Sequence, residues 1–343
     1  MRRQHALRGL RRQRRAAGGK AVAAQYGQDV ATFASPICAI RKIAKFRPRI
    51  TQTTLYAMLE IVNPFLAEYG VIRVLEHEDC DRTQVVKQIL SGTYDKPYLI
   101  EEGDSRSLYF TRELTQSGMR LSDPAALEFT YSQKMMSFLL FVHQPQHILM
   151  LGLGGGSLVK YCHRYLPTTR ITALEIDPNI LAFREQFMVP PDDARLRVVL
   201  GDAAQYLRHC RENPDVVMID AFDRDGFSPS VCSRAFYLDV HDALAPGGVM
   251  VANMVGPKDE RAAHLNIVAD VFGGNIIMLS VADEGNYLVF AFRDASFEPR
   301  WRWIEGQAKA MHSRYGLAFP EFAAMLKRSR KDGYLQGILQ LAQ

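Results

Sequence analysis

The chain has few cysteines and no long apolar run. Its 343 residues include five cysteines without a Cys-x-x-Cys pair, which disfavours zinc and disulfide frameworks, so no metal site is expected. No stretch reaches the roughly 18 apolar residues that span a bilayer. No apolar segment follows the positively charged amino terminus, as one does in secretory signals. These absences predict a cytoplasmic protein with no membrane partner.

The net charge of +5 comes from the amino-terminal segment. Residues 1–50 hold 13 lysines and arginines and a single acid, Asp29, so the rest of the chain is net acidic. An acidic body favours a cationic ligand over a nucleic acid. The basic segment has few large apolar residues, which favours a disordered tail over an arm that binds nucleic acid or an anionic membrane.

Apolar patterning predicts two segments ahead of the main domain. Residues 51–75 have the spacing of one amphipathic helix, which makes 51–90 a helical lead-in. Residues 91–122 are expected to form a small β-rich module, with two strands in YLIEEGDSRSLYFT and a third near 115–121. Asp123-Pro124 is then expected to open a helix that runs through LEFTYSQKMMSFLLFV.

After Pro145, strand-like and helical segments alternate. The strands are ILMLG, RITALEI, RVVL, DVVMID and VMVANM, and such alternation predicts a parallel sheet covered by helices on both faces. NIIMLSV and NYLVFAF are separated only by ADEG, a link that permits only antiparallel pairing. The fold class is therefore α/β, with the main domain over 123–300 and helices over 301–343.

The first strand of this sheet runs into a glycine-rich loop. ILMLGLGGGSL, residues 148–158, has glycines at Gly152, Gly154, Gly155 and Gly156. Glycine lets a ligand approach the backbone closely, and open α/β sheets bind ligands at this edge. A P-loop is excluded because no Gly-Lys-Ser/Thr follows, and Ser157 stands where a dinucleotide fingerprint needs its third glycine. The loop therefore favours a nucleoside site of the methyltransferase type.

Two later strands end in acids that suit a nucleoside. Glu175 lies about twenty residues past the glycines, where a carboxylate can accept hydrogen bonds from both ribose hydroxyls. Asp202 follows the next strand, in the sequence Gly-Asp-Ala, where it can accept from the exocyclic amine of adenine. Helix capping is the alternative for Asp202 and accounts for Asp177. It does not explain Glu175, which lies within an apolar strand end.

The fourth strand carries a cluster of acids. DVVMID ends at Asp220, and the following AFDRDGFSP adds Asp223 and Asp225. Strand-end acids at this edge face the ligand crevice, and clustered carboxylates raise each other's pKa and attract cations. A solvated loop that caps a helix near Ser230 is the alternative reading.

In this order, the motifs resemble the polyamine aminopropyltransferases, a family that includes spermidine synthase. The shared order runs over about residues 90–295, from the β module through Gln116, EFTYSQKMM, the glycine loop, LEID, GDA, IDAFD, CSRAFY and LAPGGVMV. The resemblance implies a β module before a Rossmann-like, methyltransferase-type domain, and a homodimer. It also implies transfer of the aminopropyl group of decarboxylated S-adenosylmethionine to a diamine such as putrescine, which forms spermidine and methylthioadenosine.

The same resemblance assigns roles to individual residues. The donor is a co-substrate and no cofactor is tightly bound; the donor site would comprise Gly152, Gly154, Gly155, Glu175 at the ribose, and Asp202 with Ala203 at the adenine. The amine site would comprise Asp220 as proton acceptor, Asp223 as the ammonium anchor, Tyr131 and Gln116. The chemistry agrees, because an attacking amine must lose a proton to a nearby base and a buried far ammonium needs an anionic partner.

Some positions depart from the family pattern. The family's loop usually reads GGGDGG, and Gly155 stands at its aspartate, which helps to hold the aminopropyl amine of the donor. Asp95 and Ser132 stand at two glutamines, and Ala282 lies near the place of a substrate-contacting tyrosine. Methyl transfer from S-adenosylmethionine is therefore the second reading. A non-catalytic nucleoside-binding protein is the third, against which Asp220 argues, because a mere binder needs no base.

Overall fold

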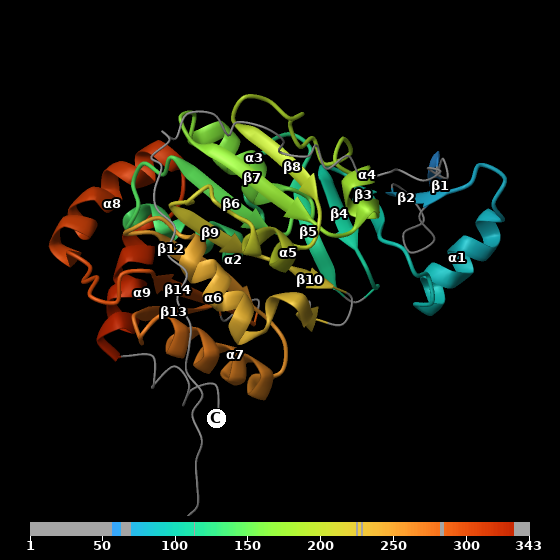
Figure 1. Cartoon of the computed structure of the whole chain (residues 1–343). Coiled ribbons are helices and arrows are strands. Elements are labelled where there is room, and N and C mark those ends of the chain that lie inside the picture. Colours follow the sequence, from blue (N-terminus) through green and yellow to red (C-terminus); the bar gives the residue numbers. More distant parts are fainter. Residues whose placement is uncertain are drawn as a thin grey trace, which may run out of the picture. The chain divides into compact units, whose positions relative to one another are not determined.

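The computed structural model describes residues 57–62, 70–112, 114–223, 226–227, 229–281 and 285–332. The basic segment 1–50 and Asp225 lie outside these ranges, as does the end of the expected carboxyl-terminal helices. The described part contains a five-stranded antiparallel sheet and a seven-stranded mixed sheet (Figure 1).

The small sheet has its strands in chain order. The strands and the helix between the second and third are β1 (Ala57–Val62), β2 (Gly70–Glu76), α1 (Arg82–Ser91), β3 (Tyr98–Glu102), β4 (Ser105–Tyr109) and β5 (Thr115–Arg120). The three strands expected from the sequence, β3 to β5, are confirmed. The helix expected over 51–75 is wrong where β1 and β2 stand. Leu59 and Ile61 are buried with a period of two, and Val62 is 81% exposed, which is the pattern of a half-buried strand.

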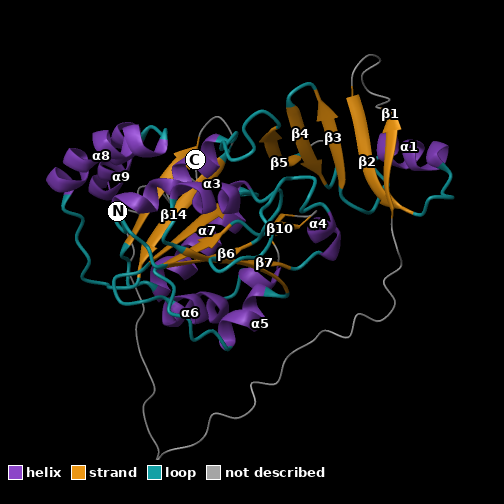
Figure 2. Ribbon diagram, turned by 90° about the horizontal axis from the view of Figure 1, so that it is seen from above, coloured by secondary structure: helices purple, strands orange, loops and turns teal. Residues whose placement is uncertain are grey.

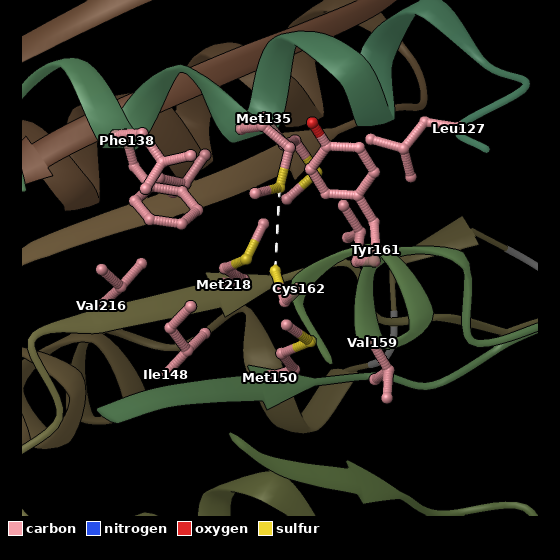
Figure 3. Close-up of a cluster of buried hydrophobic side chains, with 14 of the residues drawn as sticks. Leu127, Met135, Phe138, Ile148, Met150, Val159, Tyr161, Cys162, Val216 and Met218 are labelled. Atoms are coloured by element: carbon pink, nitrogen blue, oxygen red, sulfur yellow. Dashed lines mark hydrogen bonds between the residues drawn. The ribbon is translucent and has the colours of Figure 1, made fainter. Parts of the chain in front are cut away.

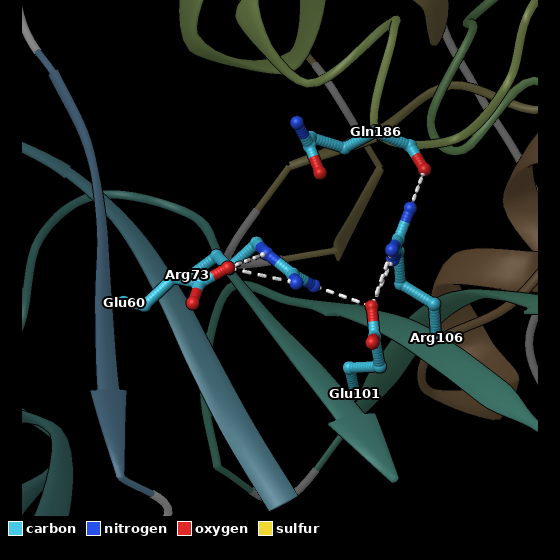
Figure 4. Close-up of polar contacts among 5 residues, drawn as sticks. All are labelled: Glu60, Arg73, Glu101, Arg106 and Gln186. Carbon is cyan, nitrogen blue, oxygen red and sulfur yellow. Dashed lines mark hydrogen bonds and ion pairs between the residues drawn. The ribbon is translucent and has the colours of Figure 1, made fainter. Parts of the chain in front are cut away.

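A chain of ion pairs crosses the small sheet and reaches the larger domain (Figure 4). Arg73 on β2 donates to Glu60 on β1 and to Glu101 on β3. Arg106 on β4 donates to the same Glu101 and to the backbone carbonyl of Gln186. These contacts fasten β4 to the segment that carries Phe187.

The large sheet has the order β13-β14-β12-β9-β6-β7-β8. Its strands are β6 (His147–Leu151), β7 (Arg170–Glu175), β8 (Leu196–Leu200), β9 (Val216–Ile219), β12 (Val249–Met254), β13 (Ile276–Val281) and β14 (Asn286–Phe292). The strands from β12 to β8 are parallel to their neighbours, and β14 pairs antiparallel with both β12 and β13. The expected parallel sheet with a terminal antiparallel hairpin is confirmed.

Helices cover both faces of this sheet (Figure 2). They are α2 (Thr130–Met135), η1 (Met136–Leu140), α3 (Ser157–Tyr165), α4 (Pro178–Ala182), α5 (Ala203–Arg208), α6 (Arg234–Ala243), α7 (Lys258–Val271), α8 (Trp301–Tyr315) and α9 (Phe319–Asp332). Side chains of α3, α8 and α9 pack with Ile148 and Met150 of β6, whereas those of α5, α6 and α7 pack with Leu149 and Leu151. Both faces of the strand are thus buried, which explains its unbroken apolar sequence.

The first of these cores lies under α2 and η1 (Figure 3). Met135 and Phe138 face residues of β6 and β9, and the Cys162 thiol of α3 lies 3.9 Å from the sulfur of Met136. The helix expected to open at Asp123-Pro124 begins seven residues later, at Thr130. Asp123 instead accepts a turn hydrogen bond from the Ala126 N–H and pairs with Arg164. The non-helical stretch that results places Phe129 in the wall of the pocket described next.

Candidate functional site

The candidate site is a pocket where the carboxyl ends of the parallel strands meet the small sheet. The space between its lining residues, counted out into the solvent at its open mouth, is about 1130 Å³. Its lining includes seven of the residues that the sequence predicts for the site: Gln116, Tyr131, Gly152, Gly154, Glu175, Ala203 and Asp220. These residues come from six elements or loops, so the fold brings together in one cavity residues that are spread over about a hundred positions of the chain.

Gly152 is required by the close approach of two strand ends. Its φ is +103°, and a Cβ on it would lie 2.1 Å from the backbone carbonyl oxygen of Asp220. The Asp220 N–H donates to the Leu151 carbonyl, and the Gly152 N–H to that of Leu174. The glycine loop therefore begins in direct contact with the strand end that carries the predicted base.

Gly155 is not among the described residues that line the pocket. A Cβ on Gly155 would lie 2.5 Å from the Ser117 hydroxyl oxygen and 2.8 Å from the Phe187 ring. An aspartate here would force Ser117 or Phe187 to move. The position that departs from the family loop is thus filled by side chains from β5 and from the segment after α4.

Glu175 joins the end of β7 to the glycine loop. Its Oε2 accepts hydrogen bonds from the N–H groups of Leu153 and Gly154, at 3.1 and 3.3 Å. Its Oε1 accepts from those of Ile176 and Asp177, both at 2.9 Å. Burial raises the pKa of Glu175, and the four N–H groups oppose that rise. Glu175 therefore shapes the loop and also lies in the pocket. Its four N–H partners match the roughly four lone-pair sites of a carboxylate, so its role at the ribose stays a prediction.

Asp202 begins α5 as its N-cap. Its Oδ1 accepts a hydrogen bond from the Gln205 N–H at 2.8 Å. The observed contact is therefore that of a helix cap, the alternative reading of this residue. Gly201 and Ala203 on either side line the pocket, and Asp202 itself is not among the described lining residues. Asp177 caps α4 in the same way, through the Asn179 N–H. The role of Asp202 at the adenine stays a prediction.

Asp220 lies at the end of β9 and presents its carboxylate to the pocket. Its Oδ2 accepts from the Tyr131 hydroxyl at 3.2 Å, and its Oδ1 accepts from the Asn253 side-chain amide at 3.0 Å. Burial raises the pKa of Asp220, and these two hydrogen bonds oppose the rise. A carboxylate with a raised pKa is a stronger proton acceptor near neutral pH than an exposed one.

Two residues near Asp220 were missed by the sequence reading. Asn253 contacts Asp220 directly, and Asn286 donates to the Asn253 side-chain oxygen at 2.9 Å. Asn253 is a buried polar residue in the otherwise apolar strand VMVANM, and that mismatch was the available signal. Asn286 directly follows a turn glycine, where asparagine is common for local reasons, so it gave no signal.

The structure describes to different extents the remaining residues of the predicted site and those at positions that depart from the family pattern. Asp223 belongs to β10 (Phe222–Asp223), and its side chain lies outside the described part. Ser132 lines the pocket and donates to the Phe129 carbonyl at 2.7 Å. Asp95 is exposed and is not among the described lining residues. Ala282 lies outside the described ranges.

The part of the chain that the structure describes lacks two further kinds of feature, metal-binding clusters and membrane-spanning helices. No group of three or more His, Cys, Asp or Glu residues there is arranged to hold a metal ion. None of the helices described is long and apolar enough to cross a membrane.

The chain is similar to known transferases. Residues 128–271 match the family model of the spermine/spermidine synthase domain. The polyamine aminopropyltransferase of Chromobacterium violaceum is 35% identical over 233 residues, which are 68% of this chain and 89% of that protein.

Solved structures share its fold. A probable spermidine synthase from Corynebacterium glutamicum covers 70% of this chain and 84% of its own, with a TM-score of 0.52 and 20% identity. Human methyltransferase-like protein 13 in complex with SAH covers 55% and 93%, with a TM-score of 0.50 and 23% identity. At these identities the likeness concerns the fold alone, and it confirms the methyltransferase-like α/β architecture.

Proposed function

Because this chain belongs to the spermine/spermidine synthase family and is a transferase of that type, we propose that it transfers the aminopropyl group of decarboxylated S-adenosylmethionine to a diamine. Putrescine is the proposed acceptor, and spermidine and methylthioadenosine are the products. The donor is consumed as a co-substrate. Family membership also supports a cytoplasmic homodimer, with a small amine as the partner of the site.

The observation that carries this proposal is the placement of Asp220. A carboxylate at a strand end faces a pocket, is fixed by two hydrogen-bond donors, and has a pKa raised by burial. In the proposed step, Asp220 takes a proton from one ammonium of the diamine. The freed lone pair attacks the methylene carbon beside the sulfonium, a C–N bond forms, and the C–S bond breaks. Both its electrons stay on sulfur, and methylthioadenosine leaves uncharged at that atom.

The rest of the pocket supports binding of the two substrates. Glu175 and Ala203 line it on the side of β7 and α5, where the ribose and adenine are proposed to lie. Tyr131 and Gln116 line it near the small sheet, on the amine side. Asp223, three residues beyond the base, is proposed to hold the far ammonium. Orienting the amine in line with the departing sulfur supplies much of the remaining rate.

Methyl transfer from intact S-adenosylmethionine is the second candidate. It is favoured by the position of Gly155, since Ser117 and Phe187 fill the space where an acid would hold the donor's amine. Neutral groups there offer less discrimination between the decarboxylated donor and the intact one.

Calorimetry and product analysis with both donors test the proposal. We expect the decarboxylated donor to bind, and putrescine to gain an aminopropyl group with release of methylthioadenosine, detected by mass spectrometry. Preferential binding of S-adenosylmethionine with methylation of an amine would replace the first candidate by the second. Nucleoside binding without turnover of either donor would leave a binding protein.

A further inference from the structure

Side chains of three neighbouring strands form one hydrogen-bonded chain at the same edge of the sheet. Asn286, the first residue of β14, donates its amide N–H to Oδ1 of Asn253 on β12 at 2.9 Å. Asn253 in turn donates to Oδ1 of Asp220, just beyond β9, at 3.0 Å. The parallel register pairs Ala252 with Ile219, so the next residue of each strand, Asn253 and Asp220, lie side by side.

Both asparagines are buried, at 2% and 7% exposure. Burying a side-chain amide is costly unless its polar atoms are paired. The other five residues of β12 are apolar and buried, so Asn253 is its one polar side chain. Sheet stability alone does not account for a buried pair of amides in contact with a carboxylate of the pocket.

The orientation of the Asn253 amide supplies that reason. The oxygen and nitrogen ends of an amide have nearly the same shape but opposite hydrogen-bonding roles. Because Asn286 donates to the oxygen of Asn253, the NH₂ end is left facing Asp220. In the reverse orientation, an amide oxygen would face a carboxylate oxygen, and only a protonated Asp220 would satisfy that contact.

We propose that Asn253 and Asn286 are positioning residues for the base: Asn286 fixes the amide of Asn253, which holds Asp220 ionised and leaves Oδ2 to take the proton. This inference rests on the proposed function, because it concerns the same carboxylate. It adds two residues that touch no substrate and act through Asp220.

The surroundings of Asp220 simplify the expected pH dependence. Among the described residues that line the pocket, the other titratable groups are Tyr131 of α2, which donates to Asp220, and Glu175 of β7. The neighbouring strand β12 presents the neutral Asn253. Since the Asn253 hydrogen bond lowers the pKa of Asp220 against the effect of burial, losing it should raise that pKa.

We call the chain from Asn286 through Asn253 to Asp220 the relay. A series of Asn→Asp variants tests it with one chemical change at three sites. Asn253→Asp removes the donor to Asp220. Asn286→Asp leaves Asn253 untouched but offers its NH₂ end a better acceptor, which turns the amide oxygen toward Asp220. Asn275→Asp is the matched control, because Asn275 is also buried and donates to the Asp294 and Phe297 carbonyls, away from the pocket. Asn286→Ala is a milder variant that frees the amide of Asn253 without recruiting it.

We expect the acidic limb of the kcat–pH profile to move up by about one to two pH units in Asn286→Asp, the size implied by losing a hydrogen bond to a charged group. In Asn253→Asp it should move by at least as much, because the second acid beside Asp220 adds to the rise in pKa. Asn286→Ala should move it less, and Asn275→Asp should lower stability without moving it. Donor KM should stay near that of the wild type. If the acidic limbs of the kcat–pH profiles of Asn253→Asp and Asn286→Asp both coincide with that of the wild type, the relay is overturned.

The pKa of the Asp220 carboxyl, followed by NMR of ¹³C-labelled aspartate, gives a readout that needs no turnover. If the wild type transfers no aminopropyl group, the proposed function fails, yet the pKa series still tests the relay. A rise in that pKa in the order wild type, Asn286→Ala, Asn286→Asp supports it. An unchanged pKa across the series overturns it.

Discussion

The backbone carbonyl of Asp220 occupies the space in which a side chain on Gly152 would begin, 2.1 Å from the ideal Cβ position. The end of β6 and the end of β9 are therefore packed against each other at the floor of the pocket. As a result, the loop that is proposed to bind the nucleoside and the strand that presents the base cannot shift independently.

Gly152→Ala should accordingly damage donor binding and folding together. Its Cβ meets backbone rather than a movable side chain, and the φ of +103° is strained for alanine. We expect a loss of stability of about 2 kcal/mol or more, within the range for strain at a special backbone conformation, and at least tenfold weaker binding of methylthioadenosine.

Gly201→Ala is the control for that prediction. Gly201 also lines the pocket, but a Cβ there meets nothing within 4 Å. Thermal unfolding and calorimetry on both variants make the comparison. Equal behaviour of the two would show that the contact between Gly152 and Asp220 does not constrain the site.

The ends of the parallel strands were predictable because each apolar run stops at a residue that changes the backbone or the polarity. Gly152, Glu175 and Asp220 each close such a run, and the topology of a parallel sheet brings them to one edge. The first two strands of the small sheet were not predictable in this way. Leu59, Ile61 and Val62 satisfy a helical and an alternating pattern equally, and only pairing with β2 decides between them.

Contacts between distant segments could not be predicted from the sequence, for a different reason. The neighbours of Gly155 are Ser117, 38 positions earlier, and Phe187, 32 positions later, and nothing local marks them as neighbours. Asn286 is joined to Asp220 only through Asn253. Such relations follow from strand order and register, which the periodicity of one strand does not contain.

Asp202→Asn separates the two roles of that residue. Asparagine is as good an N-cap as aspartate, so stability should change little. If Asp202 accepts from adenine, the loss of a charged hydrogen bond should weaken methylthioadenosine binding about tenfold. Asp177→Asn alters an equivalent cap on α4 and should leave that affinity unchanged. Calorimetry on both variants is sufficient, and wild-type affinity in Asp202→Asn would reduce this residue to a cap.

Lys160 gives a pH dependence of stability whose sign is fixed. It is 3% exposed, donates to the Phe187 carbonyl at 2.8 Å, and its pKa is lowered by burial to about 7. Between that pKa and the ordinary lysine pKa of 10.5, the unfolded chain holds a proton that the folded chain has released. Stability therefore rises with pH in this window, by at most about 1.4 kcal/mol per unit.

Urea unfolding of the wild type and of Lys160→Met across pH 7 to 10 measures this contribution. The difference between the two free energies of unfolding should grow in favour of the wild type as pH rises. A constant difference over the window would mean that Lys160 keeps its proton inside the protein.

Asp220→Asn removes the proposed base with the least change in shape. The new side chain can still accept from Asn253, so the strand end should hold its place, but it cannot take a proton. Turnover should fall by about 10² to 10⁴, while the affinity for methylthioadenosine stays near that of the wild type. Raising the pH should restore part of the activity, because more of the amine then arrives deprotonated.

Asp223→Asn should differ in kind, and the contrast makes the assignment of the base testable. A group that binds the ammonium in substrate and transition state alike should, when removed, raise the KM for the amine more than it lowers kcat. Steady-state kinetics with the amine varied at several pH values separates the two variants. Near-normal turnover of Asp220→Asn at neutral pH would remove it as the base. Inactivity at every pH with lost nucleoside binding would instead assign Asp220 a structural role, since its backbone already supports Gly152.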